Sequence, residues 1–315
     1  MQVPIRRYLG KFALVWSLAI WFPLAAAAQP VATEVLARFP HGSYLENMMA
    51  ADDGSVFYTN YFARRIERWS PDGGSKTFRE LDLLPVSLAS FGEKLLVVAH
   101  AATFDKIATV SGANRLVVMG RDGQVERSWP VDGARFLNGI EPIGEGRFLV
   151  ADSIVGAIWL IDAVRQTATV WLEHEFLRKL PASVGPNPGA NGVHYRPDGW
   201  VYVSNSERKA LYRVRITANF MPSGELEVVK DNLPGIDDFA FGPDGSVIMA
   251  SHQHEILRLT AGGMVSIVSN DESIAGSTSV VAGKGSSTGW MFATGTGGLF
   301  EGGKGEAALV RFRLP

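Results

Sequence analysis

Cysteine is absent from all 315 residues of the chain. Disulfide bonds, a catalytic thiol and Cys-ligated zinc are therefore excluded, so core burial and a bound metal are the remaining means of holding the fold. An excess of charge is absent too, because the formal net charge is −2. The sequence thus indicates no electrostatic attraction to nucleic acid or to an anionic membrane. Glycine, in contrast, is abundant at 34 residues, which is typical of many tight turns.

The N-terminus has the features of a secretory signal. Basic residues precede an apolar run at 12–24, and the small residues 25–28 offer an A-x-A cleavage site before Gln29. An uncleaved membrane anchor is the alternative, but the apolar run is shorter than the roughly 20 residues of a membrane span. The sequence predicts a signal peptide at 1–28, one domain at 29–315, and export to the periplasm or secretion.

One sequence unit recurs along the chain, and residues 189–206 (GANGVHYRPDGWVYVSNS) show it most clearly. The unit contains a leading polar residue, Asn191, a short alternating strand, a turn at Gly199, and a second strand that ends at Asn205. Both spacings recur after three other leading residues, which are Glu46, Asn138 and Asp237. A repeated unit therefore presents an oxygen-bearing side chain at the same point each time.

The number and period of these units predict the fold. Two weaker units lead with Val86 and with residues near Thr278, so six units follow one another at about 40 to 53 residues. This period matches four-stranded propeller blades, and the sequence predicts an all-β, six-bladed β-propeller with a central metal site. A β-sandwich is the alternative. Residues 33–39 and 310–315 are expected to share one blade and close the ring. The long connections 101–114 and 172–190 are expected to form lids.

The repeat also predicts a site at one end of the propeller. The start of each inner strand and the end of the antiparallel second strand lie at the same end of a blade, so the leading residues meet around one mouth: Glu46, Asn138, Asn191 and Asp237. A ring outside them is expected to contain Asn60, His100, Asp152, Asn205, Ser251 and His252. Four oxygen-bearing side chains suit a hard cation such as Ca²⁺, with Zn²⁺, Mn²⁺ or Mg²⁺ as alternatives. Two converging carboxylates also need a counter-cation, although any single leading residue could instead cap a strand.

The order Glu, Asn, Asn, Asp, with glycine after Asn138 and after Asn191, resembles the regucalcin/gluconolactonase family. The resemblance covers roughly residues 40–300. It implies a six-bladed propeller with a divalent metal, usually calcium, in the channel, and a lactonase activity. Carried over by residue, it implies that Glu46, Asn138, Asn191 and Asp237 are metal ligands and that Asp237 is the usual candidate base.

The chain departs from that family in ways that indicate a different substrate. The pair Asp237-Asp238 is closer to the Asp-Asn pair of the related paraoxonases, and His100 stands in a context that resembles one paraoxonase catalytic histidine. Asp238 and His100 are thus alternative bases. Phe136 occupies the position where regucalcin carries an arginine for sugar acids, which favours a less polar substrate.

These observations predict a metal-dependent hydrolase of a lactone or related ester, in which water attacks a metal-polarised carbonyl. The substrate is expected to contact residues at the mouth of the channel, which are Asn60, Phe136, Asp152, Asn205 and His252. Nucleic acid and membrane are not expected as partners after signal cleavage. The alternatives are a non-catalytic binding propeller with a structural metal and a non-hydrolytic enzyme similar to strictosidine synthase.

Overall fold

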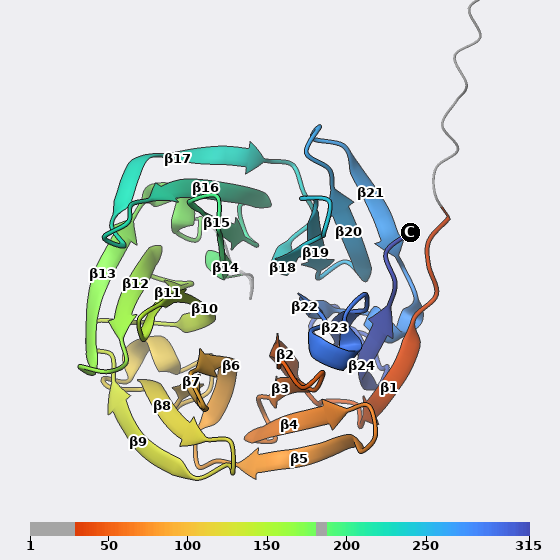
Figure 1. Ribbon diagram of the computed structural model, residues 1–315, viewed down its shortest axis with the longest axis horizontal. Helices are drawn as coiled ribbons and strands as arrows, with labels where there is room; N and C mark the ends of the chain where they lie inside the picture. Colours follow the sequence, from red (N-terminus) through yellow and green to blue (C-terminus); the bar gives the residue numbers. More distant parts are fainter. Residues whose placement is uncertain (1–28, 181–187) are drawn as a thin grey trace, which may run out of the picture.

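Six four-stranded antiparallel sheets form a ring in the computed structural model, which describes residues 29–180 and 188–315 (Figure 1). In five of the sheets the strand that comes first along the chain lies next to the central channel and the last lies at the rim. In the sixth sheet the strand closest to the N-terminus lies at the rim instead. The predicted all-β, six-bladed propeller is confirmed. The predicted signal peptide, residues 1–28, lies outside the described residues, so its cleavage and the export of the protein stay predictions. No helix in the described part is long and apolar enough to cross a membrane.

Five blades follow the chain in order. The first contains β2 Leu45–Ala50, β3 Val56–Asn60, β4 Arg65–Ser70 and β5 Gly74–Glu80. The second contains β6 Leu84–Phe91, β7 Lys94–His100, β8 Asn114–Gly120 and β9 Val125–Pro130. The third contains β10 Leu137–Gly144, β11 Arg147–Asp152, β12 Ala157–Asp162 and β13 Thr167–Glu173. The fourth contains β14 Ala190–Arg196, β15 Trp200–Asn205, β16 Ala210–Ile216 and β17 Pro222–Lys230, and the fifth β18 Ile236–Phe241, β19 Val247–Ser251, β20 Glu255–Leu259 and β21 Val265–Ser269.

The sixth blade combines both ends of the described chain. Its strands are β22 Ser277–Ala282, β23 Met291–Gly295, β24 Ala307–Phe312 and, from the N-terminal side, β1 Glu34–Phe39. β1 pairs antiparallel with β24, and the Glu34 carboxylate accepts hydrogen bonds from Arg311 Nε and Nη2, each at 2.8 Å. The predicted closure of the ring by the two termini is confirmed. Pairing β1 with β24 covers a strand edge that would otherwise be open.

The inner strand of every blade contains a β-bulge at its leading residue. The register with the second strand shifts between Leu45 and Met48 in β2, and the same shift occurs at the start of β6, β10, β14, β18 and β22. A bulge bends the strand and re-aims one side chain. The bulges therefore explain why the residue after Leu45, which is Glu46, can face the channel.

Asp-Gly turns close the inner hairpins of the first, fourth and fifth blades. In the fifth blade, Asp244 Oδ1 accepts hydrogen bonds from Ser246 N at 3.2 Å and Ser246 Oγ at 2.6 Å, and Asp244 Oδ2 pairs with Arg258 at 2.5 Å. Gly245 has φ of +79°, a conformation that side chains other than glycine rarely adopt. The recurring glycine of the sequence unit is therefore a turn requirement.

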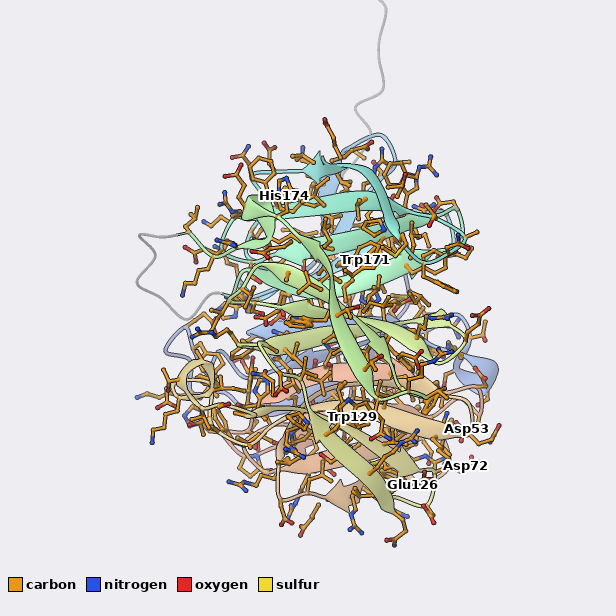
Figure 2. All side chains as sticks on the ribbon, turned by 90° about the vertical axis from the view of Figure 1, so that its left-hand side faces the viewer. Asp53, Asp72, Glu126, Trp129, Trp171 and His174 are labelled. Atoms are coloured by element: carbon orange, nitrogen blue, oxygen red, sulfur yellow. The ribbon has the colours of Figure 1, made fainter. Side chains whose placement is uncertain are left out.

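The hydrophobic core lies between neighbouring blades. Trp171 of β13, for example, packs with Val193 and Val201 of the fourth blade, and Trp129 of β9 packs with residues of the third (Figure 2). Short 3₁₀ helices occur only in connections of the described chain, at η1 Ile107–Thr109, η2 Glu175–Leu177, η3 Glu272–Ile274 and η4 Gly285–Ser287. Packing between blades fixes the positions of the inner strands and hence of the channel side chains.

Candidate active site

A cavity of about 510 Å³ opens at the end of the channel where the inner strands begin. Each of four residues that line it is the second residue of an inner strand: Glu46, Asn138, Asn191 and Asp237. Their exposed fractions are 4%, 2%, 2% and 3%, so these side chains form the deepest part of the cavity. The structure thus brings together the four residues that the repeat predicts as metal ligands.

Three of these side chains hold a buried oxygen without a hydrogen-bond partner, which are Glu46 Oε2, Asn138 Oδ1 and Asp237 Oδ2. A buried acceptor left unpaired costs about 1–3 kcal/mol. Unpaired oxygens around one cavity fit a hard divalent cation, which binds oxygen ligands. Within the described residues, no group of three or more His, Cys, Asp and Glu side chains could hold a metal by itself. A site here therefore needs the carboxamides as well as the carboxylates.

Burial and like charge act together on the two carboxylates. Burial, followed by repulsion from Asp238, raises the pKa of Glu46 to about 8, against the lowering effect of a hydrogen bond from Tyr44. Burial, followed by the charges of Glu46 and Asp238, raises the pKa of Asp237 well above its usual range. A cation favours the charged form of a neighbouring carboxylate and offsets both effects. The donor set therefore fits a divalent cation.

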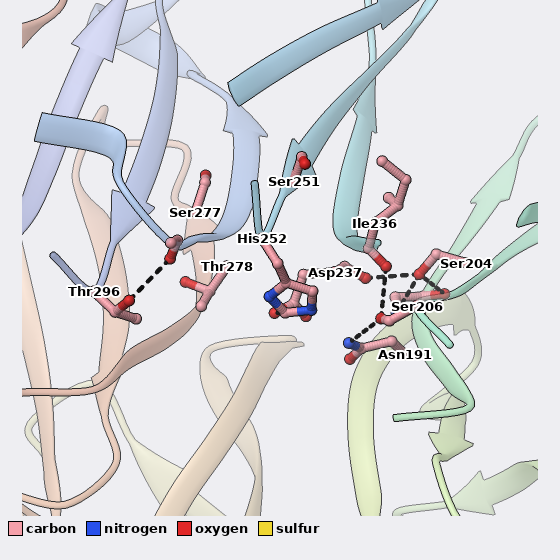
Figure 3. Close-up of polar contacts among 12 residues, drawn as sticks. Asn191, Ser204, Ser206, Ile236, Asp237, Ser251, His252, Ser277, Thr278 and Thr296 are labelled. Atoms are coloured by element: carbon pink, nitrogen blue, oxygen red, sulfur yellow. Dashed lines mark hydrogen bonds and ion pairs between the residues drawn. The ribbon is translucent and has the colours of Figure 1, made fainter. Parts of the chain in front are cut away.

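Two serines orient the carboxamides. Asn191 Nδ2 donates to Ser206 Oγ at 3.0 Å, and Ser206 Oγ donates to the first carbonyl of the next inner strand at 2.7 Å (Figure 3). One blade earlier, Asn138 Nδ2 donates to Ser153 Oγ at 3.4 Å, and Ser153 Oγ donates to the equivalent carbonyl at 2.7 Å. Because each amide nitrogen is held by a serine, the amide oxygen is left for the cavity.

Replacing Ser206 with alanine is expected to weaken Ca²⁺ binding about 10- to 100-fold, because Asn191 then loses the partner that fixes its orientation. Isothermal titration of the metal-free protein with Ca²⁺ measures the change. Ser251→Ala is the matched control, since Ser251 is equally buried at the end of β19 but accepts a hydrogen bond from Gln253 N. Equal Ca²⁺ affinity in the two variants would show that Ser206 does not orient a ligand.

The glycine after each leading asparagine permits close approach of neighbouring inner strands. A Cβ atom on Gly139 would lie 2.5 Å from the carbonyl oxygen of Asn191, and a Cβ on Gly192 would lie 2.6 Å from Asp238 Oδ1. Any side chain there would push the strands apart. The Asn-Gly dipeptides of the sequence are therefore a packing requirement of the channel.

Tyr44 and His252 complete the inner wall. The hydroxyl of Tyr44 bonds to Glu46, and burial, followed by the Glu46 charge, raises the pKa of Tyr44 well above 10. His252 Nε2 lies 3.6 Å from Asp237 Oδ2 and has no hydrogen-bond partner. Burial lowers the pKa of His252 to about 4, so its imidazole is neutral. The sequence repeat did not predict a role for Tyr44. His252 was predicted to contact the substrate, and it lines the cavity.

Asp238 does not line the cavity, in contrast to Asp237. Its Oδ1 accepts a hydrogen bond from His194 Nε2 at 2.8 Å, and its Oδ2 accepts one from Ser279 Oγ at 2.8 Å. Burial lowers the pKa of His194, but the charges of Asp238 and Glu141 outweigh it and raise that pKa to about 10. Both oxygens of Asp238 are therefore engaged, and its catalytic role stays a prediction that no contact supports.

His100 is fully buried behind the cavity wall. Its Nε2 donates to the Leu137 carbonyl at 2.9 Å, its Nδ1 accepts from the Tyr61 hydroxyl at 3.2 Å, and its ring packs 4.9 Å from that of Phe136. Burial lowers the pKa of His100 to about 3, so the ring is neutral. Phe136, whose ring packs against His100, lines the cavity, whereas His100 does not. The catalytic role of His100 therefore also lacks a supporting contact.

Three other predicted substrate contacts do not line the cavity in the described structure, and these are Asn60, Asp152 and Asn205. The Asp152 carboxylate accepts four backbone hydrogen bonds from its own blade, and Asn205 Nδ2 donates to the Phe176 carbonyl. In two units the residue after the end of the second strand lines the cavity instead, and these residues are Ser153 and His252. The bulge shifts the register by one residue, and a one-residue shift exchanges the faces of a strand. A repeat spacing that is one residue longer, counted from the leading residue Asn138, would have identified Ser153.

Both long connections contribute to the cavity. Phe104 comes from the first, next to η1, and Lys179 and Pro188 come from the second, while residues 181–187 lie outside the described residues. The second connection also contains the short 3₁₀ helix η2. Their action as lids stays a prediction.

The fold and the site together define a six-bladed propeller with an oxygen-rich cavity at one mouth of its channel. A family model described as "SdiA-regulated" matches residues 99–261, and the chain belongs to this family. None of the curated proteins matches the chain.

Solved structures with the same fold include regucalcin, a calcium-binding protein from Agrobacterium tumefaciens, at a TM-score of 0.65 and 15% identity, covering 92% of this chain and 98% of that one. A gluconolactonase from Xanthomonas campestris has a TM-score of 0.64 at 12% identity, covering 89% and 88%. Virginiamycin B lyase from Staphylococcus aureus has a TM-score of 0.59 at 14% identity, covering 89% and 99%. The predicted resemblance to regucalcins and gluconolactonases is therefore confirmed for the fold.

Proposed function

We propose that the protein is a divalent-metal-dependent hydrolase of a lactone or related ester. The observation that carries the proposal is the set of unpaired buried oxygens of Glu46, Asn138 and Asp237 in the deepest part of a cavity of about 510 Å³. A cavity of this volume is within the range of small-molecule sites. The fold shared with regucalcin and a gluconolactonase supports the proposal, with Ca²⁺ as the first candidate metal.

In this proposal Glu46, Asn138, Asn191 and Asp237 hold the cation, which when bound supplies Lewis-acid polarisation of the substrate carbonyl. His252 Nε2, which lies 3.6 Å from Asp237 Oδ2 and has no partner, accepts the proton of the attacking water. Asp237 remains the alternative base. Tyr44, bonded to Glu46, fixes that carboxylate against the cavity wall.

One serine has the sequence context of a covalent nucleophile, but its position in the structure excludes that role. Residues 285–289, GSSTG, match the G-x-S-x-G pattern around Ser287. Ser287 is buried, belongs to η4, and donates its hydroxyl proton to the Gly54 carbonyl at 2.6 Å. It does not line the cavity, so water is the proposed nucleophile.

Hydrolysis of a panel of lactones and aryl esters, followed by pH-stat, tests the proposal. Activity is expected with Ca²⁺, Mg²⁺, Mn²⁺ or Zn²⁺ added to the metal-free protein and is expected to disappear in EDTA. A folded protein that hydrolyses no member of the panel with any of the four metals would rule out the hydrolase. Retained metal-dependent stabilisation in that case would support the alternative of a binding propeller with a structural metal.

Neutralising one carboxylate is expected to have opposite effects with and without metal. Glu46→Gln removes repulsion among buried carboxylates, so the melting temperature in EDTA is expected to rise by a few degrees. At a Ca²⁺ concentration about 100 times the Kd, Ca²⁺ binding raises the free energy of unfolding of the wild type by about 2.7 kcal/mol. The increase for the variant is expected to be far smaller. Differential scanning calorimetry with EDTA and with Ca²⁺ checks both. An equal gain from Ca²⁺ in both proteins would remove Glu46 from the ligand set.

A lyase is the second candidate, favoured by the unpaired His252 Nε2 on the cavity wall and by the fold shared with virginiamycin B lyase. Elimination opens a cyclic ester by removing a carbon-bound proton, and it adds no water. Mass spectrometry of the product formed in ¹⁸O-labelled water separates the two candidates. Incorporation of one ¹⁸O atom indicates hydrolysis, and an unsaturated product without ¹⁸O indicates the lyase.

A further inference from the structure

Aromatic rings form a large part of the cavity wall. Tyr44, Phe104, Phe136 and Phe300 all line it, although they come from four separate segments of the chain. The ring centroids of Tyr44 and Phe300 lie 5.0 Å apart, those of Phe104 and Phe300 lie 5.7 Å apart, and both pairs have edge-to-face geometry. Such pairs are favourable contacts in addition to their burial. The wall is therefore a fixed apolar surface.

Polar groups line the cavity beside these rings. They include Ser153, Lys179 and His252 as well as the four leading residues of the repeat. The deepest part contains the buried oxygens around Asp237, whereas the carboxylates of Asp105 and Glu301 are on exposed residues at the opening. The aromatic rings and Ile154 line the cavity in addition to these groups. A ligand whose reacting carbonyl reaches Asp237 can therefore place the rest of its structure against the carbons of these rings.

We infer that the substrate is a lactone or ester with an uncharged apolar substituent, an alkyl or aryl group, next to the reacting carbonyl. This inference rests on the proposed function and adds the substrate class. Burial of apolar surface against the aromatic wall supplies the binding energy. Phe104 and Phe300 are the residues that determine specificity for the substituent.

A polyhydroxylated lactone fits this wall poorly. Each hydroxyl group on such a ring loses its hydrogen bonds to water on entering the cavity, and the rings of Phe104, Phe136 and Phe300 offer no polar partner in return. The tyrosine hydroxyl in the wall is engaged by Glu46. Sugar lactones are therefore expected to be poor substrates compared with alkyl lactones of the same ring size.

Phe62 and Phe300 provide a matched pair of variants. Both rings are 40% exposed, and both contact Tyr44 and Phe104, at 5.7 and 5.5 Å for Phe62 and at 5.0 and 5.7 Å for Phe300. Only Phe300 of the two lines the cavity. Loss of either ring disturbs the same aromatic cluster, so a difference between Phe62→Ala and Phe300→Ala reports on contact with the substrate.

The experiment has a binding arm and a hydrolysis arm, both on the Ca²⁺-loaded protein. Isothermal titration measures the affinity of γ-lactams with substituents from methyl to heptyl, which resemble lactones but resist hydrolysis. The pH-stat measures kcat/KM for the corresponding γ-lactones and for glucono-1,5-lactone. Affinity and kcat/KM are expected to rise by up to about fourfold for each methylene until the cavity is filled. Phe300→Ala and Phe104→Ala are expected to lower the heptyl-to-methyl ratio about tenfold, whereas Phe62→Ala keeps it.

The two arms separate failure of the inference from failure of the proposed function. Lactam affinity that rises with chain length, without hydrolysis of any lactone, supports an apolar-substituent site and rules out the hydrolase. Hydrolysis without dependence on chain length, or faster hydrolysis of glucono-1,5-lactone than of the heptyl lactone, overturns the inference and leaves the hydrolase standing. An unchanged heptyl-to-methyl ratio in Phe300→Ala overturns the assignment of Phe300.

Discussion

Replacing Asp237 with asparagine is expected to lower kcat/KM for lactone hydrolysis at least 100-fold. The change removes a carboxylate that lies beside His252, lines the deepest part of the cavity and holds an oxygen without a protein partner. A neutral amide binds a divalent cation more weakly and cannot accept a proton from water. Steady-state hydrolysis at saturating Ca²⁺, with circular dichroism to verify the fold, measures the effect.

Asp238→Asn is the matched comparison for this variant. Asp238 is the adjacent residue and is equally buried, at 2% exposed, but its oxygens are held by His194 and Ser279. This variant is expected to keep Ca²⁺ binding and most of the activity, and to lose stability because the charged His194 loses a partner. Full activity in Asp237→Asn would disprove the proposed role of Asp237. Complete loss in a folded Asp238→Asn would assign the catalytic role to Asp238 instead.

Deleting residues 29–39 is expected to destabilise the propeller by about 5 kcal/mol, because β1 is the strand that closes the sixth blade. The deletion removes the backbone pairing with β24 and the packing of Leu36, Ala37 and Phe39 in one core cluster. It also leaves β24 as an open edge, which favours aggregation. Urea unfolding and light scattering measure the two effects.

The control for the deletion is Glu34→Ala. This variant removes the ion pair with Arg311, in which the Glu34 side chain is 52% exposed, and it leaves the strand in place. An exposed ion pair contributes about 0–1 kcal/mol to stability, so only a small loss of stability is expected. A deletion variant that is no less stable than Glu34→Ala would show that the ring closes without β1.

The sequence predicted the four candidate metal ligands but not the groups that hold them in place. The leading positions of Asn138 and Asn191 recur at fixed spacings because each blade has the same hairpin and the same turn glycine. Ser153 and Ser206, which orient these amides, were missed because the bulge shifts the register by one residue. A bulge depends on packing between strands and has no residue pattern of its own here.

The same limit applies to His100. Its position at the end of β7 follows from the repeat, but its burial behind Phe136 depends on contacts between the second and third blades. Sequence spacing gives the end of the channel at which a residue lies. It does not give the direction of a side chain relative to a neighbouring blade.

The sequence by itself determined the number of blades, the closure of the ring by its two ends, and the convergence of Glu46, Asn138, Asn191 and Asp237. These features follow from strand periodicity and turn chemistry, which act over short distances along the chain. The tertiary structure decided which neighbours reach the cavity. It brought together Phe104 of the second blade and Phe300 of the sixth, because loops of different blades meet only when the ring closes.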